Sequence, residues 1–282
     1  MNDHDWTEAL DHEPNSRPLT DNEVITEILQ RLQDLDSTPT SAQADLQARL
    51  SIARSLIRRI DSLSLLSSPE RFESQLQIVS GLQNLAYYDT AQGGVEDIAS
   101  WCLRAYLQLM AQGHEDSAEV LAGIGRGWLL RVQATLARIH RYDGSSSSGT
   151  SSDRPSSMAN STERVGSFTA SEDAREFARQ TIEANARAGG ADYVEARGML
   201  LPATEYLQRS VEAAERNGTL EGSLLSLAAE AFLSMGNVSY SHHSEQYFQM
   251  AVRYLQMAHR IPDYRLSPYL QSYLDEFGRL LP

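Results

Sequence analysis

Three glycines near the middle of the chain come closest to a phosphate-binding loop. Gly123, Gly125 and Gly127 alternate with Ile124 and Arg126, whereas a dinucleotide-binding loop has the spacing G-x-G-x-x-G between a strand and a helix. The apolar residues around this motif repeat with a helical period instead. Because residues 123 and 127 share one face of a helix, we interpret the glycines as positions where two helices pack closely.

Histidine and glutamate occur in pairs that could begin a metal site. His114 and Glu115 start like the zinc-protease motif H-E-x-x-H, but Ala118 stands where the second histidine is needed. His242 and His243 are adjacent in sequence, so we expect them not to share a helix face. A tetrahedral zinc site needs three or four convergent ligands. We therefore expect no bound metal, and we predict that residues 114–115 lie in an exposed turn.

Nucleophiles and cationic catalytic groups are scarce. The one cysteine, Cys102, lies in an apolar stripe beside Trp101 and Leu103, which predicts a buried structural thiol. All 24 basic side chains are arginines, and the absence of lysine excludes Schiff-base chemistry and the usual lysines of ATP-binding loops. We expect no catalytic residue, no cofactor and no enzymatic activity. The alternative is an all-α enzyme with a carboxylate or histidine site between helices.

The charge balance is strongly acidic. The 282 residues include 38 acidic side chains, and the net charge is -14. Nucleic-acid binding depends on neutralising phosphates, so this balance argues against a nucleic-acid partner. Basic residues are nevertheless concentrated in one segment, and we predict that they contact an acidic partner; the alternative is an ordinary solvated helix face. These residues are Arg49, Arg54, Arg58 and Arg59.

The chain shows no sign of export or of a membrane. Its longest apolar runs are only a few residues, too short to span a bilayer. The first residues, 2–6, are acidic and lack the apolar core of a signal peptide. We expect a cytoplasmic or nuclear protein with no membrane partner.

Composition divides the chain into four segments. Residues 1–20 are polar and predict a disordered acidic tail, and residues 142–170 contain a serine run that predicts a disordered loop. Residues 21–141 and 171–282 carry the helical patterns, and we expect the second set to pack on the first. One hypothesis is that the serine-rich segment is phosphorylated and then engages arginines of the helices.

Apolar residues between these segments repeat at three- and four-residue intervals, which is typical of amphipathic helices. Strand-like alternation is absent, so the predicted fold class is all-α, with about ten helices in antiparallel hairpins. Ser68-Pro69 and Ser267-Pro268 predict helix starts. Three glycines after apolar runs predict helix ends: Gly113, Gly218 and Gly236.

The C-terminal part resembles tetratricopeptide (TPR) repeats. Residues 228–237, which end in Met235-Gly236-Asn237, are similar to a TPR first helix and its turn. Ala251, Leu255 and Ala258, followed by Pro262, are similar to the second helix. The spacing between the two is longer than the family pattern, with residues 238–243 as the expected insertion. The resemblance covers roughly residues 195–282, and residues 95–141 are a weaker candidate.

This resemblance implies a right-handed superhelical array of hairpins that acts as a non-catalytic scaffold or adaptor. Such an array holds a peptide or helix of a partner protein in its groove. One subclass of the family binds the carboxylate end of chaperones through lysine and asparagine; the absence of lysine argues against that clamp here, because the planar guanidinium of arginine has a different geometry. A regulatory subunit that is stable only in its complex is a further alternative.

Overall fold

The computed structural model describes residues 20–37, 43–90, 93–147 and 170–278. Within these ranges the secondary structure consists of helices without strands, in agreement with the predicted all-α class. Ten of them are α-helices, and two short 3-10 helices, Leu65–Ser67 and Pro69–Arg71, precede the third of these. None of the described helices has the length and hydropathy required to cross a membrane. The contacts divide the chain into two compact units, residues 1–78 and 79–282.

The first unit is built on two helices, α1 (Asp21–Ser37) and α2 (Gln43–Ser62). Thr20 and Glu23 form a capping box at the start of α1, in which the Thr20 backbone N–H donates to Glu23 Oε2 at 2.7 Å. The buried side chains recur at helical spacing on both helices, so each turns one apolar face inward. They are Val24, Ile25, Ile28, Leu32 and Leu35 on α1, and Leu46, Leu50, Ala53, Leu56 and Ile60 on α2.

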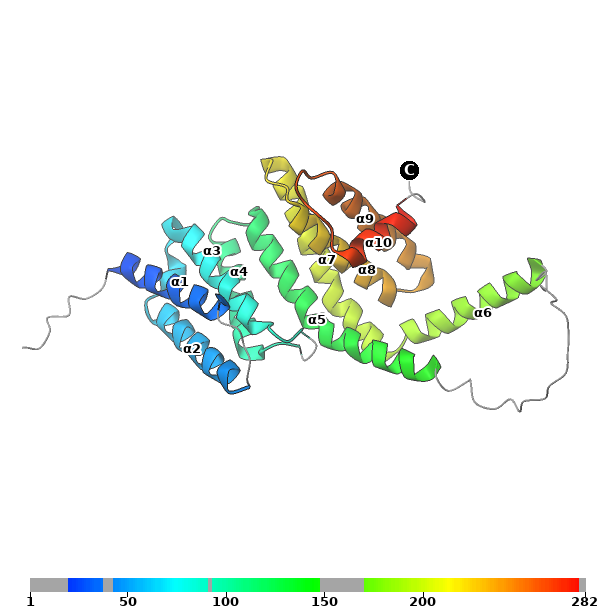
Figure 1. The fold of residues 1–282 in the computed structure, drawn as a ribbon, viewed down its shortest axis with the longest axis horizontal. Coiled ribbons are helices and arrows are strands. Elements are labelled where there is room, and N and C mark those ends of the chain that lie inside the picture. The colour runs from blue at the N-terminus through cyan, green and yellow to red at the C-terminus, as the bar shows by residue number, and fades with distance from the viewer. Residues whose placement is uncertain (1–19, 38–42, 91–92, 148–169, 279–282) are drawn as a thin grey trace, which may run out of the picture. The chain divides into compact units, whose positions relative to one another are not determined.

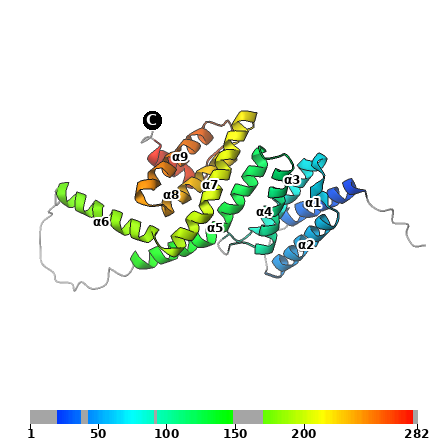
Figure 2. The ribbon, with the colours of Figure 1, turned by 180° about the vertical axis from the view of Figure 1, so that it is seen from behind.

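The second unit contains the end of α3 (Phe72–Ala86) and seven further helices. These are α4 (Glu96–Ala111), α5 (Ala118–Ser147), α6 (Ala170–Ala188), α7 (Ala191–Asn217), α8 (Gly222–Val238), α9 (Ser241–His259) and α10 (Pro268–Phe277). Both views show α5 and α7 side by side along much of their length (Figures 1 and 2). Helices α8 and α9 form an antiparallel hairpin against α7, and α10 covers α9 (Figure 1).

Two glycines let α5 approach its neighbours on opposite sides. A Cβ atom at Gly125 would lie 2.7 Å from Leu207 Cγ of α7, and one at Gly123 would lie 2.3 Å from the Tyr106 ring of α4. Neither distance is tolerated between carbon atoms. The interpretation of residues 123–127 as a close-packing segment is therefore confirmed, and the resemblance to a phosphate loop has no structural basis.

Two local predictions about helix ends are wrong, and a third is confirmed only in part. Helix α5 continues through Ser147, into the segment predicted as a loop, and Tyr193 supports this extension by donating to Asp143 Oδ2 at 2.7 Å. Gly236 does not end its helix but lies inside α8, where it makes room for the Phe248 ring. Ser68-Pro69 does mark a helix start, since the 3-10 helix Pro69–Arg71 begins there, but the Ser68 side chain makes no cap; its carbonyl accepts a hydrogen bond from Gln75.

Residues 238–243, which were expected to be an insertion, do not form an inserted loop in the structure. Only Ser239 and Tyr240 separate α8 from α9, and both adjacent histidines belong to the first turn of α9. The longer spacing seen in the sequence thus reflects longer helices. The predicted disorder at residues 1–19 and 148–169 lies outside the described residues.

Candidate functional site

The predicted arginine cluster on α2 is partly used within the first unit. Arg59 Nη2 lies 2.9 Å from Glu27 Oε2 of α1, and Arg49 donates to the carbonyl of Leu35, also on α1. Arg58 is exposed, whereas Arg54 is half-buried. The four side chains therefore do not form one outward-facing surface, and their role in partner binding stays a prediction.

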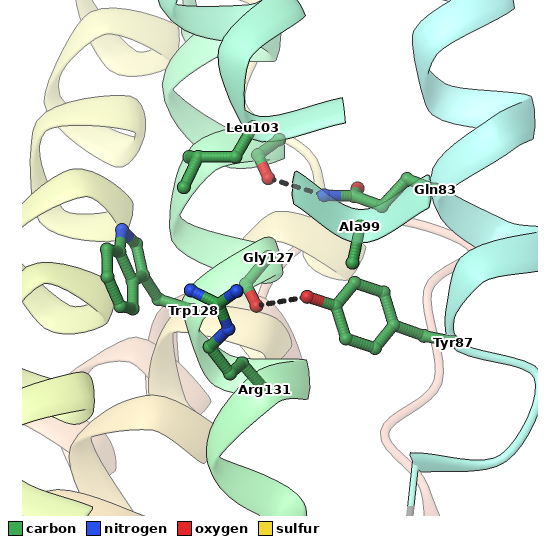
Figure 3. A pocket seen from close by; sticks show the side chains of 8 residues that line it. Gln83, Tyr87, Ala99, Leu103, Gly127, Trp128 and Arg131 are labelled. Atoms are coloured by element: carbon green, nitrogen blue, oxygen red, sulfur yellow. Dashed lines mark hydrogen bonds between the residues drawn. The ribbon is translucent and has the colours of Figure 1, made fainter. Parts of the chain in front are cut away.

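A small cavity lies where α3, α4 and α5 meet (Figure 3). Gln83 Nε2 donates to the carbonyl of Gly123 at 2.8 Å, and the Tyr87 hydroxyl donates to the carbonyl of Gly127 at 3.2 Å. Trp128 and Arg131 close the side toward α5, with the Arg131 guanidinium carbon 5.6 Å from the Trp128 ring centroid. The cavity volume is about 10 Å³, which is enough for about one water molecule. This cavity is therefore a gap in the packing of the three helices and not a substrate pocket.

The single thiol is buried on α4. Cys102 on α4 is 1% exposed, as its apolar stripe predicts, and burial raises its pKa to about 12. A thiol is nucleophilic only as the thiolate. Cys102 therefore contributes to packing and offers no reactive group at neutral pH.

The histidine motifs do not assemble a metal site in the part of the chain that the structure describes. Ala118, at the position of the missing second ligand, is buried at the start of α5. The rings of His242 and His243 are closer than expected for adjacent residues, with centroids 4.1 Å apart. No group of three or more histidine, cysteine, aspartate or glutamate side chains among the described residues is placed to hold a metal ion.

The strongest candidate site is a hollow at the turn between α8 and α9, which we call the α8–α9 groove. Its volume is about 390 Å³ and it opens to solvent. Helix α7 contributes one side chain, the end of α8 and the turn contribute three, and the first turns of α9 contribute the others. The lining residues are Arg197, Met235, Ser239, Tyr240, His242, His243 and Tyr247.

Arg197 is held in the groove by two contacts. Its Nη1 donates to the carbonyl of Val238 at 2.6 Å, and its guanidinium carbon lies 4.8 Å from the centroid of the Tyr240 ring. Val238 is the last residue of α8, so its carbonyl belongs to the unpaired, partially negative end of the helix. The cation is thereby oriented by a helix terminus and an aromatic face.

The aromatic side of the groove forms a short stack. Tyr240 and His242 are stacked with centroids 5.9 Å apart, and His243 follows His242. Deeper in the hairpin, the Tyr247 ring lies 6.3 Å from Phe232. The lining of the groove therefore includes exposed histidine rings and also the ring of Tyr247, which approaches the core residue Phe232.

Helix α6 determines where α9 begins. Asn185 Oδ1 accepts hydrogen bonds from the backbone N–H and from the hydroxyl of Ser241, each at 3.0 Å. An amide oxygen from another helix thus takes the place of an N-cap side chain, which Tyr240 does not supply. This contact holds the histidine turn in position.

A second open hollow, of about 560 Å³, lies between α9 and α10. Arg260 and Asp275 both line it, so its charges are mixed. Gln256 crosses one side and donates to the carbonyl of Gly278 at 3.1 Å. Unlike the α8–α9 groove, it has no tyrosine in its lining, and its one ring is that of His259.

No protein-family model matches the chain. Neither a curated protein nor a solved structure is significantly similar to it.

Sequence reasoning singled out the two histidines of the groove but not its cation or its tyrosines. Arg197 and Val238 are 41 residues apart, and no local spacing connects them. The C-terminal hairpins carry several tyrosine and arginine side chains, and no local pattern distinguishes those that line the groove. Which of them converge depends on how α7 packs against the α8–α9 hairpin.

Proposed function

We propose that this protein is a non-catalytic scaffold or adaptor whose C-terminal helical hairpins bind a segment of another protein. The observation that carries the proposal is the α8–α9 groove, an open aromatic and cationic hollow at a hairpin turn. Tyrosine, methionine and arginine are enriched at the centres of protein interfaces. An open groove also suits an extended chain or a helix better than a small substrate that must be enclosed.

Exposed apolar side chains on α7 extend this surface. Val194 is 53% exposed and Leu201 is 48% exposed. Residues 194, 197 and 201 follow one another at intervals of three and four, so these two side chains share a helix face with Arg197. The face continues from the groove and offers apolar area that a bound polypeptide would bury.

The succession of α7, α8 and α9 supports a TPR-like arrangement as part of this proposal. The two-residue turn makes α8 and α9 antiparallel, and α8 also packs on α7. Each helix thereby contacts its sequence neighbours, as in arrays of helical hairpins. Two features differ from the family pattern: Gly236 lies inside a helix, and the helices are longer than the resemblance implies.

The enzyme alternative has weaker support. The small cavity between α3, α4 and α5 has room for about one water molecule. The α8–α9 groove and the hollow between α9 and α10 are larger, but both are open to solvent. Their lining residues include no pair of carboxylates, which general acid–base catalysis by two acids would use. Ser239 lines the α8–α9 groove with two histidines, but its hydroxyl donates to the carbonyl of Met235 at 2.7 Å rather than to a histidine acting as its base. A cytoplasmic or nuclear location and the lack of a nucleic-acid partner stay predictions.

Affinity purification of the tagged full chain, followed by mass spectrometry, tests the proposed function. The matched samples are the wild type and the Tyr240→Ala variant, which removes the ring at the centre of the groove. We expect at least one protein to be captured by the wild type and lost with the variant, and the purified pair to bind directly. If every captured protein binds both chains equally, the groove is not the binding surface.

A further inference from the structure

We propose that the α8–α9 groove selects a polypeptide segment that presents an aspartate or glutamate side chain next to an apolar residue; this inference rests on the proposed function. The ligand class follows from the charges of the lining. The groove contains one arginine and two histidines and no carboxylate, although acidic side chains outnumber basic ones by 38 to 24 in the whole chain. A carboxylate group complements this lining.

Nearby carboxylates are already engaged elsewhere. Glu195 accepts hydrogen bonds from Thr135 and from Arg138, the latter at 2.7 Å. Glu245 accepts one from Gln249 at 3.1 Å. Neither residue lines the groove. The positive charge of the groove is therefore not neutralised by a carboxylate in its own lining.

Arg197 is suited to bind a carboxylate. A guanidinium has five N–H donors in a rigid fork, and the structure assigns one hydrogen bond from this side chain, to the Val238 carbonyl. Its contact with the Tyr240 ring holds the plane of the fork without consuming a donor. An arginine that is oriented in advance loses less entropy when a carboxylate binds.

The side chains around Arg197 indicate which kind of ligand residue would lie next to the carboxylate. Met235 is buried in the floor of the groove, Tyr247 is half-buried, and Val194 and Leu201 are exposed beside Arg197. An apolar residue next to the anionic one would cover these side chains and exclude water from the ion pair. The first turn of α9 contains no acidic residue, and the partial positive charge of a helix N-terminus favours an anion there.

A protein segment fits this surface better than a nucleic acid. Binding to a polyanion draws on many phosphate contacts, and the groove provides a single permanent cation. The net charge of -14 would repel a nucleic acid as a whole. A short segment with one or two carboxylates avoids most of that repulsion.

The test is selection from a displayed library of random peptides, using the immobilised full-length protein. Each peptide is flanked by fixed linkers, so that no library residue carries a terminal carboxylate. Enriched peptides are then measured by fluorescence anisotropy against the wild type, Arg197→Gln and Arg197→Lys. Arg253→Gln, an exposed position on α9 outside the groove, removes the same charge as a control, and thermal unfolding verifies that each variant is folded.

We expect the enriched peptides to contain aspartate or glutamate beside an apolar residue. Loss of the charged hydrogen-bonding fork in Arg197→Gln should weaken binding about tenfold. Arg197→Lys should lose less affinity than Arg197→Gln, and Arg253→Gln should bind the peptides as tightly as the wild type does. Enriched peptides that are neutral, or that bind Arg197→Gln undiminished, would overturn this inference but leave the proposed function standing. If no peptide is enriched over a surface without protein, both are contradicted.

Discussion

The hydroxyl of Ser210 on α7 donates a 2.6 Å hydrogen bond to the backbone carbonyl of Ala118, the first residue of α5. The Ser210 side chain is fully buried, so this bond forms away from water. It connects residues that are 92 positions apart in the chain. It thus fixes the C-terminal part of α7 against the start of α5.

Ser210→Ala should destabilise the second unit. The substitution removes a buried hydrogen bond, for which a cost of about 1–2 kcal/mol in the free energy of unfolding is expected. Urea unfolding followed by circular dichroism measures it. Ser223→Ala is the matched control, because the Ser223 hydroxyl is exposed and contacts only the nearby Glu221; it should change stability by less than about 0.5 kcal/mol. Equal effects of the two variants would show that the Ser210 bond contributes nothing.

Gly125→Ala should weaken the contact between α5 and α7. The new Cβ would lie 2.7 Å from Leu207 Cγ and 3.1 Å from the Leu207 backbone nitrogen, and the backbone atom cannot move aside as a side chain can. Overpacking of this kind costs about 1–3 kcal/mol.

Gly198→Ala on α7 is the control for this substitution, since a Cβ there meets no atom within 4 Å. Alanine is favoured over glycine inside a helix by about 1 kcal/mol, so this variant should unfold at a higher temperature than the wild type. Thermal unfolding of both variants measures the difference. A stabilising Gly125→Ala would mean that α5 and α7 do not approach as closely as the structure shows.

Cys102 should resist alkylation in the folded protein. Burial raises its pKa to about 12, and a thiol reacts as the thiolate, so at pH 8 both access and ionisation are unfavourable. Iodoacetamide labelling followed by mass spectrometry should show slow modification that becomes fast in denaturant. In the Ser55→Cys variant, the added thiol at an exposed position of α2 should react quickly while Cys102 does not. Rapid labelling of Cys102 in native buffer would contradict its buried placement.

Helix α1 should lose stability in acid. The backbone N–H and hydroxyl of Thr20 lower the pKa of Glu23, and the hydrogen bond from Arg59 lowers the pKa of Glu27. A carboxyl group whose pKa is lower in the folded state stabilises that state above its unfolded pKa, about 4.3 for glutamate. This contribution disappears as the pH falls through the folded pKa.

Hydrogen exchange of residues 21–37, corrected for the intrinsic effect of pH, measures this loss. Protection should be constant from pH 7 to about pH 5 and should decrease below the ordinary pKa of glutamate. The double variant Glu23→Gln, Glu27→Gln should begin with lower protection and show a flatter pH profile. A profile in the variant as steep as that of the wild type would assign the effect to other groups.

The helices themselves could be predicted because their signals are local. The apolar stripe from Val24 to Leu35 lies on one face of α1 and is buried there. Ser267 caps α10 by accepting from the Leu270 backbone N–H, and Gly218 ends α7 with φ of 68°, both as the sequence indicates. Each of these features depends on residues within one or two turns.

The positions of helix ends and the assembly of the groove were decided by tertiary contacts. Gly236 has the sequence context of a helix stop, yet the approach of Phe248 explains its presence inside α8. Arg59 belongs to a basic segment, yet Glu27 on another helix binds it. The sequence by itself determined which residues form helices and which faces are apolar, since backbone hydrogen bonding and side-chain periodicity act over a few residues. Only the packing of α7 on the α8–α9 hairpin decided that Arg197, Tyr240 and the two histidines share one groove, because that depends on contacts between residues far apart in the chain.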